Sequence, residues 1–196
     1  MIEPLAIPGL WLLTPKVHRD GRGAFAETFR ASTLADAGVD RPFVQENLVR
    51  TTGAGVLRGL HFQRQPHAQD KLIQVLSGRI FDVAVDMRPG SPTLGRSVGV
   101  TLAAETPQLI FIPRGFAHGY LTLTGDCAVL YKATGYYAPQ SEGGLRWNDP
   151  ALAIAWPDVP VSTNERDAGW PGFEEAISAL AFPSPLAGEG VSEADG

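Results

Sequence analysis

The sequence is poor in cysteine, in basic residues and in long apolar runs, and each shortage excludes a class of protein. The single cysteine, Cys127, cannot form an intrachain disulfide, which favours a reducing compartment. No run approaches the roughly 18 apolar residues that a membrane span requires. The chain has 16 Lys and Arg residues against 21 Asp and Glu residues, and the resulting net charge of −5 argues against general nucleic-acid and membrane-surface binding.

A secretory leader is not expected either. Residues 1–14 are mostly apolar, but Glu3, Pro4 and Pro8 interrupt them and no basic segment precedes them. Together with the lone cysteine, this pattern predicts a cytoplasmic protein.

Helical periodicity is scarce, whereas turn residues are plentiful. The 22 glycines and 16 prolines separate short apolar runs, which is typical of an all-β sandwich or barrel. Strand-like runs lie at residues 72–76, 79–87, 97–102, 108–112, 119–123 and 128–134. The first two flank a turn at Ser77 and Gly78. We expect only short helices, at residues 31–37 and 173–180.

Length and composition predict one domain. A chain of 196 residues with 44% apolar content can build one substantial core. We expect this domain to span residues 1–181. Residues 182–196 are rich in Pro, Gly, Ala and acidic side chains, so they are expected to form a disordered tail.

Two short segments carry the chemical information. Residues 113–118 (PRGFAH) have the Pro-x-Gly-x-x-His form of a cupin half-site, which supplies one imidazole in metal-binding members of that barrel class. Residues 58–63 (RGLHFQ) occupy the place of the other half-site, yet they contain His-Phe-Gln instead of His-x-His. Lys71 stands where the metal-binding pattern has a Glu. A protonated lysine cannot ligate a metal, so the pattern indicates a metal site rebuilt for acid–base chemistry.

Taken one at a time, the candidate residues have ordinary structural interpretations. His118 could anchor a loop through its ring nitrogens as readily as serve a function. Lys71 could extend its charged end to solvent from the edge of a strand. Tyr131 alternates with core positions and is equally a packed tyrosine. Asp167 lies in a polar segment that resembles a solvated loop. The placement of His61 with Arg58, Lys71 and His118 at cupin-like positions favours a functional site, whereas nothing local to Asp167 does.

Together these segments resemble the dTDP-4-dehydrorhamnose 3,5-epimerases, from about Gly21 to Asp167. The resemblance is carried by residues 22–27 (RGAFAE), 43–47 (FVQEN), 55–61 (GVLRGLH), 82–86 (DVAVD), 91–93 (SPT), 113–118 (PRGFAH), 136–139 (YYAP) and 147–150 (WNDP). It implies a cupin-type β-barrel, or jelly roll, that works as a homodimer without metal or organic cofactor. The implied reaction inverts C3 and C5 of dTDP-4-dehydro-6-deoxy-D-glucose, giving dTDP-4-dehydro-L-rhamnose through an enolate.

The resemblance also implies roles for the catalytic residues. His61 is expected to be the general base and Asp167 the carboxylate that orients it. Tyr131 is expected to return a proton to the opposite face of the sugar. Lys71, with Arg58 and His118 nearby, is expected to stabilise the enolate oxygen or to hold the sugar.

The resemblance further implies substrate contacts, for which the expected residues are Arg22, Glu27, Gln45, Asn47, Arg58, Lys71, His118, Tyr137, Glu142 and Arg166. Tyr137 corresponds to an aromatic residue that stacks on thymine. Arg22 and Glu27 are expected to reach the site of the partner subunit. The sequence departs from the family pattern at two positions. Glu46 stands where Asp is common, which is a mild change, and Arg166 replaces an expected Lys, which keeps the charge but alters its geometry.

Three alternatives remain open at this stage. Relatives on this scaffold epimerise a single carbon, so a mono-epimerase on a related substrate is the first. A metal-dependent cupin oxygenase or isomerase would use His61 and His118 with a carboxylate, against which Gln63 and Lys71 argue. A non-catalytic sugar-nucleotide-binding barrel is the third, and it would not need both His61 and Tyr131.

Overall fold

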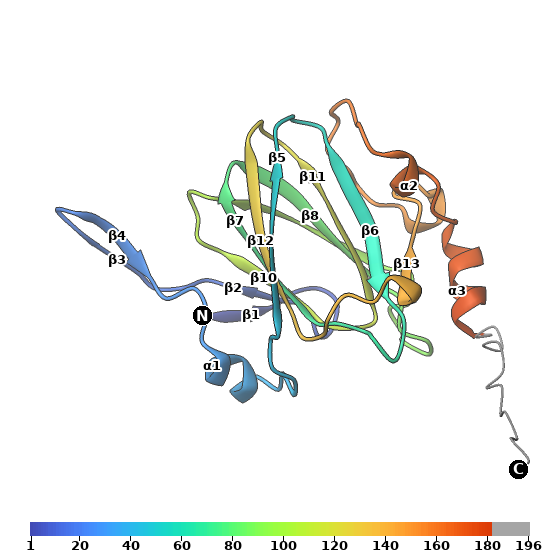
Figure 1. Ribbon diagram of the computed structural model, residues 1–196, viewed down its shortest axis with the longest axis horizontal. Coiled ribbons are helices and arrows are strands. Elements are labelled where there is room, and N and C mark those ends of the chain that lie inside the picture. The colour runs from blue at the N-terminus through green and yellow to red at the C-terminus, as the bar shows by residue number, and fades with distance from the viewer. Residues whose placement is uncertain (182–196) are drawn as a thin grey trace, which may run out of the picture.

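The computed structural model describes residues 1–181 as two antiparallel sheets packed face to face (Figure 1). One sheet has the strand order β1-β2-β10-β7-β12-β5, and the other has the order β13-β6-β11-β8-β9. The strands of the first sheet are β1 (Ile2–Pro4), β2 (Trp11–Leu13), β10 (Leu109–Ile112), β7 (Lys71–Ser77), β12 (Cys127–Ala133) and β5 (Gln45–Thr51). Those of the second are β13 (Glu142–Gly144), β6 (Leu57–Gln63), β11 (Phe116–Thr122), β8 (Arg79–Asp86) and β9 (Ser97–Ala103). This arrangement confirms the predicted all-β, jelly-roll barrel with a few short helices.

Alternating apolar side chains explain why the sheets pack together. The buried cluster between them draws Ile73 and Val75 from β7, Val129 from β12, and Ile80 and Ala84 from β8. Successive side chains in a strand point to opposite faces, so the intervening residues face outward. Burial of this inner face supplies most of the driving force for the fold.

The strands predicted from apolar runs are present with small boundary shifts. β7 and β8 flank the turn at Gly78, but they belong to different sheets, so this turn crosses the barrel instead of closing a hairpin. Gly78 has a φ of +74°, and a Cβ there would lie 2.6 Å from Cys127 Sγ. The tight crossing therefore requires glycine.

Three short α-helices, two 3₁₀ turns and one hairpin complete the described chain. The helices are α1 (Ala31–Asp36), α2 (Glu165–Ala168) and α3 (Phe173–Ala181), with 3₁₀ turns at Pro139–Ser141 and Pro150–Leu152. Helix α1 packs over the outer face of the larger sheet, where Leu34 contacts a cluster with Leu72 and Phe111. Strands β3 (Val17–Asp20) and β4 (Gly23–Ala26) form a hairpin that projects away from the barrel (Figure 1).

The remaining fold predictions concern the chain ends and membranes. The predicted tail at residues 182–196 lies outside the described residues. The helices predicted at residues 31–37 and 173–180 correspond to α1 and α3. None of the helices in residues 1–181 is long and apolar enough to cross a membrane.

Candidate active site

A cavity of about 410 Å³ opens between the two sheets and collects most of the predicted site residues. The predicted residues that line it are Gln45, Asn47, Arg58, His61, Lys71, His118, Tyr131, Tyr137, Glu142, Arg166 and Asp167. They come from six strands, helix α2 and the connecting segments, so the closed barrel brings together positions far apart in the sequence.

Strand register places the polar residues on the inner walls. Tyr131 of β12 is paired with Asn47 of β5 and with Ile73 of β7, and residues directly opposite in a sheet share one face. In the facing sheet His118 of β11 is paired with His61 of β6. His61 and Tyr131 therefore project into the cavity from opposite sheets.

His61 forms a dyad with Asp167. The imidazole Nε2 lies 2.8 Å from Asp167 Oδ1, and the buried carboxylate also accepts a hydrogen bond of 2.9 Å from the Gly59 amide. An ionised Asp167 requires the proton to reside on Nε2, which leaves the Nδ1 lone pair of His61 free to accept a proton. The dyad thus has the geometry of a base and its orienting group.

Helix α2 fixes the carboxylate half of this dyad. Asn164 caps the helix by accepting a hydrogen bond of 2.7 Å from the Asp167 amide, and Arg166 Nε lies 3.3 Å from Asp167 Oδ1. Burial by itself raises the pKa of Asp167, but hydrogen bonds from His61 and the Gly59 amide outweigh burial. The net pKa of Asp167 is lowered, which keeps the carboxylate ionised beside the imidazole.

Burial in the cavity wall shifts the pKa values of Lys71 and Tyr131. Burial lowers the pKa of Lys71 to about 8, although Asp82 and Glu142 act in the opposite direction. Burial is also the main reason that the pKa of Tyr131 is raised, with Glu142 and Tyr137 adding to it. At neutral pH the lysine is mostly a cation and the phenol keeps its proton.

A second histidine–carboxylate pair lies deeper in the same sheet. His118 Nε2 is 2.8 Å from Asp82 Oδ2, and both side chains are buried. The sequence had left the role of His118 open between anchoring and function. Its second ring nitrogen is available to a ligand because the Asp82 contact uses only one.

Glu142 organises the more exposed rim of the cavity. Its carboxylate accepts a hydrogen bond of 3.1 Å from the Tyr137 hydroxyl and pairs with Arg166 at 3.3 Å. The Tyr137 amide donates to Gln45 Oε1 at 3.0 Å, and Gln45 Nε2 donates to Asn47 Oδ1 at 3.1 Å. These five predicted contact residues therefore form one connected chain of hydrogen bonds.

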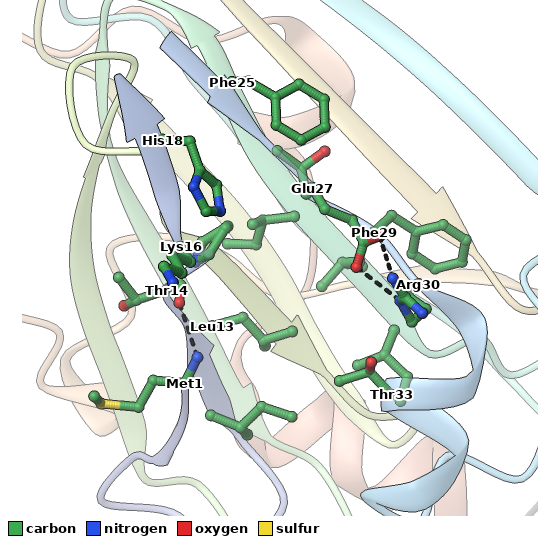
Figure 2. Close-up of a pocket in the computed structure, with 16 residues that line it drawn as sticks. Met1, Leu13, Thr14, Lys16, His18, Phe25, Glu27, Phe29, Arg30 and Thr33 are labelled. Carbon is green, nitrogen blue, oxygen red and sulfur yellow. Dashed lines mark hydrogen bonds and ion pairs between the residues drawn. The ribbon is translucent and has the colours of Figure 1, made fainter. Parts of the chain in front are cut away.

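Arg22 and Glu27 are the two predicted residues that do not line this cavity. Arg22 is exposed near the tip of the β3–β4 hairpin and pairs with Asp20, while Glu27 pairs with Arg30. Glu27 and Phe25 face a second cavity, of about 420 Å³, at the base of the hairpin (Figure 2). Neither residue serves the active cavity within a single chain.

The donor set does not match a metal centre. Within residues 1–181 no group of three or more His, Cys, Asp and Glu side chains is arranged to hold a metal ion. His61 and His118 each face a carboxylate of their own, and Lys71 occupies the wall between the sheets. The side chains suit proton transfer better than ligation.

Several cavity residues were not singled out from the sequence. Asn164, Gln69 and Tyr120 line the cavity, and Asp82 supports His118 from behind. For Asp82 a signal existed, because an acidic residue alternates with apolar ones in the 79–87 run and such residues are seldom buried unless paired. Tyr120 gave no comparable signal, since a tyrosine in a buried strand is an ordinary core residue.

The fold and the cavity define a cupin-type β-barrel protein equipped for acid–base chemistry on a bound ligand. A family model described as dTDP-4-dehydrorhamnose 3,5-epimerase matches residues 4–175. The chain belongs to the dTDP-4-dehydrorhamnose 3,5-epimerase family, whose curated members are isomerases.

Individual relatives support this assignment. The dTDP-4-dehydrorhamnose 3,5-epimerase of Neisseria gonorrhoeae is 46% identical over 96% of this chain, which spans 57% of that relative's length. The dTDP-6-deoxy-D-glucose-3,5-epimerase of Legionella pneumophila, solved with dTDP-4-keto-L-rhamnose, is 42% identical with a TM-score of 0.88, covering 92% of this chain and 96% of its own. A 3'-monoepimerase of Streptomyces bikiniensis, solved with dTDP-quinovose, is 36% identical with a TM-score of 0.84, covering 91% and 90%.

Proposed function

We propose that this chain epimerises C3 and C5 of dTDP-4-dehydro-6-deoxy-D-glucose, giving dTDP-4-dehydro-L-rhamnose. The observation that carries the proposal is the placement of His61 and Tyr131 on opposite sheets, with Lys71 in the same cavity. Inversion at carbon needs a base on one face and an acid on the other, and this pair supplies both.

The proposed steps use only side chains of the cavity. His61 Nδ1 takes the proton from the carbon next to the ketone, and the electron pair of the C–H bond moves to the C4 oxygen as an enolate. The Lys71 ammonium stabilises that oxygen, and Asp167 stabilises the imidazolium. The enolate then collapses to the ketone as Tyr131 gives its proton to the opposite face of the carbon.

The remaining cavity residues bind the substrate in this proposal. Arg58 and His118 hold the sugar near the reacting carbons. Gln45, Asn47, Glu142 and Arg166 contact the nucleotide sugar at the rim. Tyr137, 48% exposed, stacks on the thymine. The reaction requires no metal or organic cofactor, since the carbon acid is activated by the neighbouring ketone.

We further propose that the protein is a cytoplasmic homodimer in which the β3–β4 hairpin carries Arg22 and Glu27 to the partner's cavity. Phe25 on the hairpin is 70% exposed, and Leu48 and Leu76 on the outer face of the larger sheet are 49% and 47% exposed. Large exposed apolar side chains that gather on one surface are typical of an interface. The lone, buried Cys127 fits a reducing compartment.

Hydrogen exchange tests the reaction directly. The purified protein is incubated with dTDP-4-dehydro-6-deoxy-D-glucose in D₂O, and the nucleotide sugar is analysed by NMR. We expect deuterium at both C3 and C5 and the L-rhamno configuration. Deuterium at one carbon only would assign the chain to the mono-epimerases, and no incorporation would reject the proposed chemistry.

Two variants locate the base in the same assay. His61→Ala is expected to lower exchange at both carbons by at least about 10²-fold, the lower end of general-base catalysis, while dTDP still binds. His67→Ala is the matched control, because His67 is exposed in a loop and does not line the cavity. Exchange that survives in His61→Ala would show that another group is the base.

A further inference from the structure

Buried polar atoms that lack a hydrogen-bond partner are uncommon, and two of them belong to side chains that line the active cavity. Among residues 1–181 the unpaired atoms are Asn47 Nδ2, Asp82 Oδ1, Tyr120 OH and Trp170 Nε1. Asn47 and Tyr120 line the cavity itself, and Asp82 lies behind His118. More than nine in ten buried polar groups in native proteins are paired, so the two unpaired groups on the cavity wall are candidates for contact with a polar ligand.

Tyr120 is the member of this group without an assigned role. It lies on β11, opposite Arg58 of β6 and Asp82 of β8, and its ring centroid is 6.4 Å from that of His118. Only 5% of its surface is exposed, and its ring belongs to the core cluster between the sheets. The ring thus packs as a core residue while the side chain also forms part of the cavity wall.

The Tyr120 hydroxyl forms no hydrogen bond within residues 1–181 that would stabilise the fold. A phenylalanine would fill the same volume without burying an unpaired hydroxyl, which is unfavourable. Thr51 lies near the phenol and acts on its pKa. Within residues 1–181 the phenol nevertheless has no hydrogen-bond partner, and the Thr51 hydroxyl accepts a hydrogen bond of 3.2 Å from Arg58. A ligand oxygen in the cavity would satisfy the phenol and recover the lost interaction.

The protonation state of Tyr120 suits a neutral donor. Burial raises the pKa of Tyr120 to about 12, although Arg58 and Thr51 act in the opposite direction. The phenol therefore keeps its proton at neutral pH. Its depth also distinguishes it from the rim, because Tyr137 is 48% exposed and Tyr120 is almost fully buried.

We propose that the Tyr120 hydroxyl donates a hydrogen bond to a hydroxyl oxygen of the bound hexose ring and is a specificity-determining contact of this site. The inference rests on the proposed function, which puts the hexose deep in the cavity and the nucleotide at the rim. Lys71 serves the C4 oxygen, so the ring hydroxyls are the remaining sugar oxygens for a neutral donor on β11. A site with such a donor disfavours sugars that lack the matching oxygen.

Binding measurements with two ligands test this contact. Calorimetry gives the Kd of dTDP and of dTDP-glucose for the wild type, for Tyr120→Phe and for Tyr136→Phe. Tyr136 is the matched control, because it is 72% exposed and does not line the cavity. We expect Tyr120→Phe to weaken dTDP-glucose roughly threefold to tenfold, the range for one neutral hydrogen bond, and to leave dTDP unchanged.

Thermal unfolding separates this role from a structural one. Because Tyr120→Phe removes an unpaired buried hydroxyl, its Tm without ligand is expected to equal or exceed that of the wild type. Equal weakening of both ligands together with a lower Tm would make Tyr120 a structural residue and overturn the inference. Unchanged dTDP-glucose binding would overturn it as well.

The inference and the proposed function fail in different ways. If the wild type binds dTDP and dTDP-glucose and exchanges deuterium but Tyr120→Phe behaves identically, only the Tyr120 contact is wrong. If the wild type binds neither ligand, the proposed function itself is wrong. If Tyr120→Phe binds normally but no longer incorporates deuterium at one carbon, Tyr120 is a proton donor instead of a binding contact.

Discussion

At the scale of single residues, burial determines what each ionisable side chain can do. Asp167 and Lys71 are both removed from water, yet only the carboxylate forms hydrogen bonds that outweigh the effect of burial on its pKa. Its charged form is therefore favoured, while the charged form of Lys71 is penalised. In the proposed mechanism the ionised carboxylate stabilises the imidazolium of His61, and the charged form of Lys71 stabilises the enolate oxygen.

Lys71 leads to a prediction for pH dependence. Because its pKa is about 8, kcat/KM for deuterium exchange is expected to fall as pH rises through about 8, where the ammonium loses its proton. In Lys71→Arg, whose guanidinium stays charged well above that pH, this falling limb should disappear even if the overall rate is lower. A limb near pH 8 that persists in Lys71→Arg would assign it to another group.

Lys71 also makes the stability of the fold depend on pH, but stability is expected to rise with pH where activity falls. The folded-state pKa of Lys71 lies below its ordinary value of 10.5, so the unfolded chain binds more protons between about pH 8 and pH 10.5. The contribution of Lys71 to the free energy of unfolding therefore rises with pH across that window. Urea unfolding of the wild type and Lys71→Arg along the same pH series measures it.

At the scale of elements, strand β6 is held unusually close to β11. Gly59 has a φ of +123°, and a Cβ there would lie 2.6 Å from Gly119 Cα and 2.8 Å from the His118 carbonyl oxygen. The Gly59 amide also donates to Asp167. This glycine connects the packing of the two strands with the orientation of the dyad.

We expect Gly59→Ala to lower the free energy of unfolding and to abolish exchange. Backbone strain alone contributes about 1–3 kcal/mol, and the contact with β11 adds to it. Gly90→Ala is the matched control, because Gly90 has a φ of +77° but nothing within 4 Å of a Cβ. Urea unfolding gives both values, and equal losses would mean that β11 accommodates the methyl group.

At the scale of the whole molecule, the proposed homodimer would bring the β3–β4 hairpin of one subunit to the cavity of the other. The β3–β4 hairpin projects from the barrel (Figure 1). Arg22 lies in its turn and Glu27 directly follows β4, and neither residue lines the cavity that it is expected to serve. A twofold dimer in which each hairpin crosses to the other barrel would complete two equivalent sites.

Subunit complementation tests this arrangement. Arg22→Ala and His61→Ala chains carrying different tags are co-expressed, and the heterodimer is purified. If Arg22 acts across the interface, one site of the heterodimer has both residues intact, so roughly half of wild-type exchange should return. A heterodimer of His61→Ala with Asp167→Asn is the control and should stay inactive, since both residues belong to one cavity. A lack of recovery with Arg22→Ala would place Arg22 outside the partner's site.

Much of the site followed from the sequence because its motifs are local. The half-site at 113–118 and the altered one at 58–63 fixed His118, His61 and their barrel positions, and apolar alternation fixed most strands. The partners of the histidines were harder to predict from the sequence, because the His61–Asp167 contact joins residues 106 positions apart. No local pattern encodes such a separation, and only the resemblance had suggested it.

The sequence by itself determined an all-β barrel and a cavity of proton-transfer side chains, because turn spacing, strand alternation and short motifs are properties of neighbouring residues. The tertiary structure alone decided which side chains face one another and which are deprived of water. It paired His118 with Asp82, lowered the pKa of Lys71 and left the Tyr120 hydroxyl without a partner. These properties depend on burial and on contacts between distant strands, and they arise only when the two sheets close over the cavity.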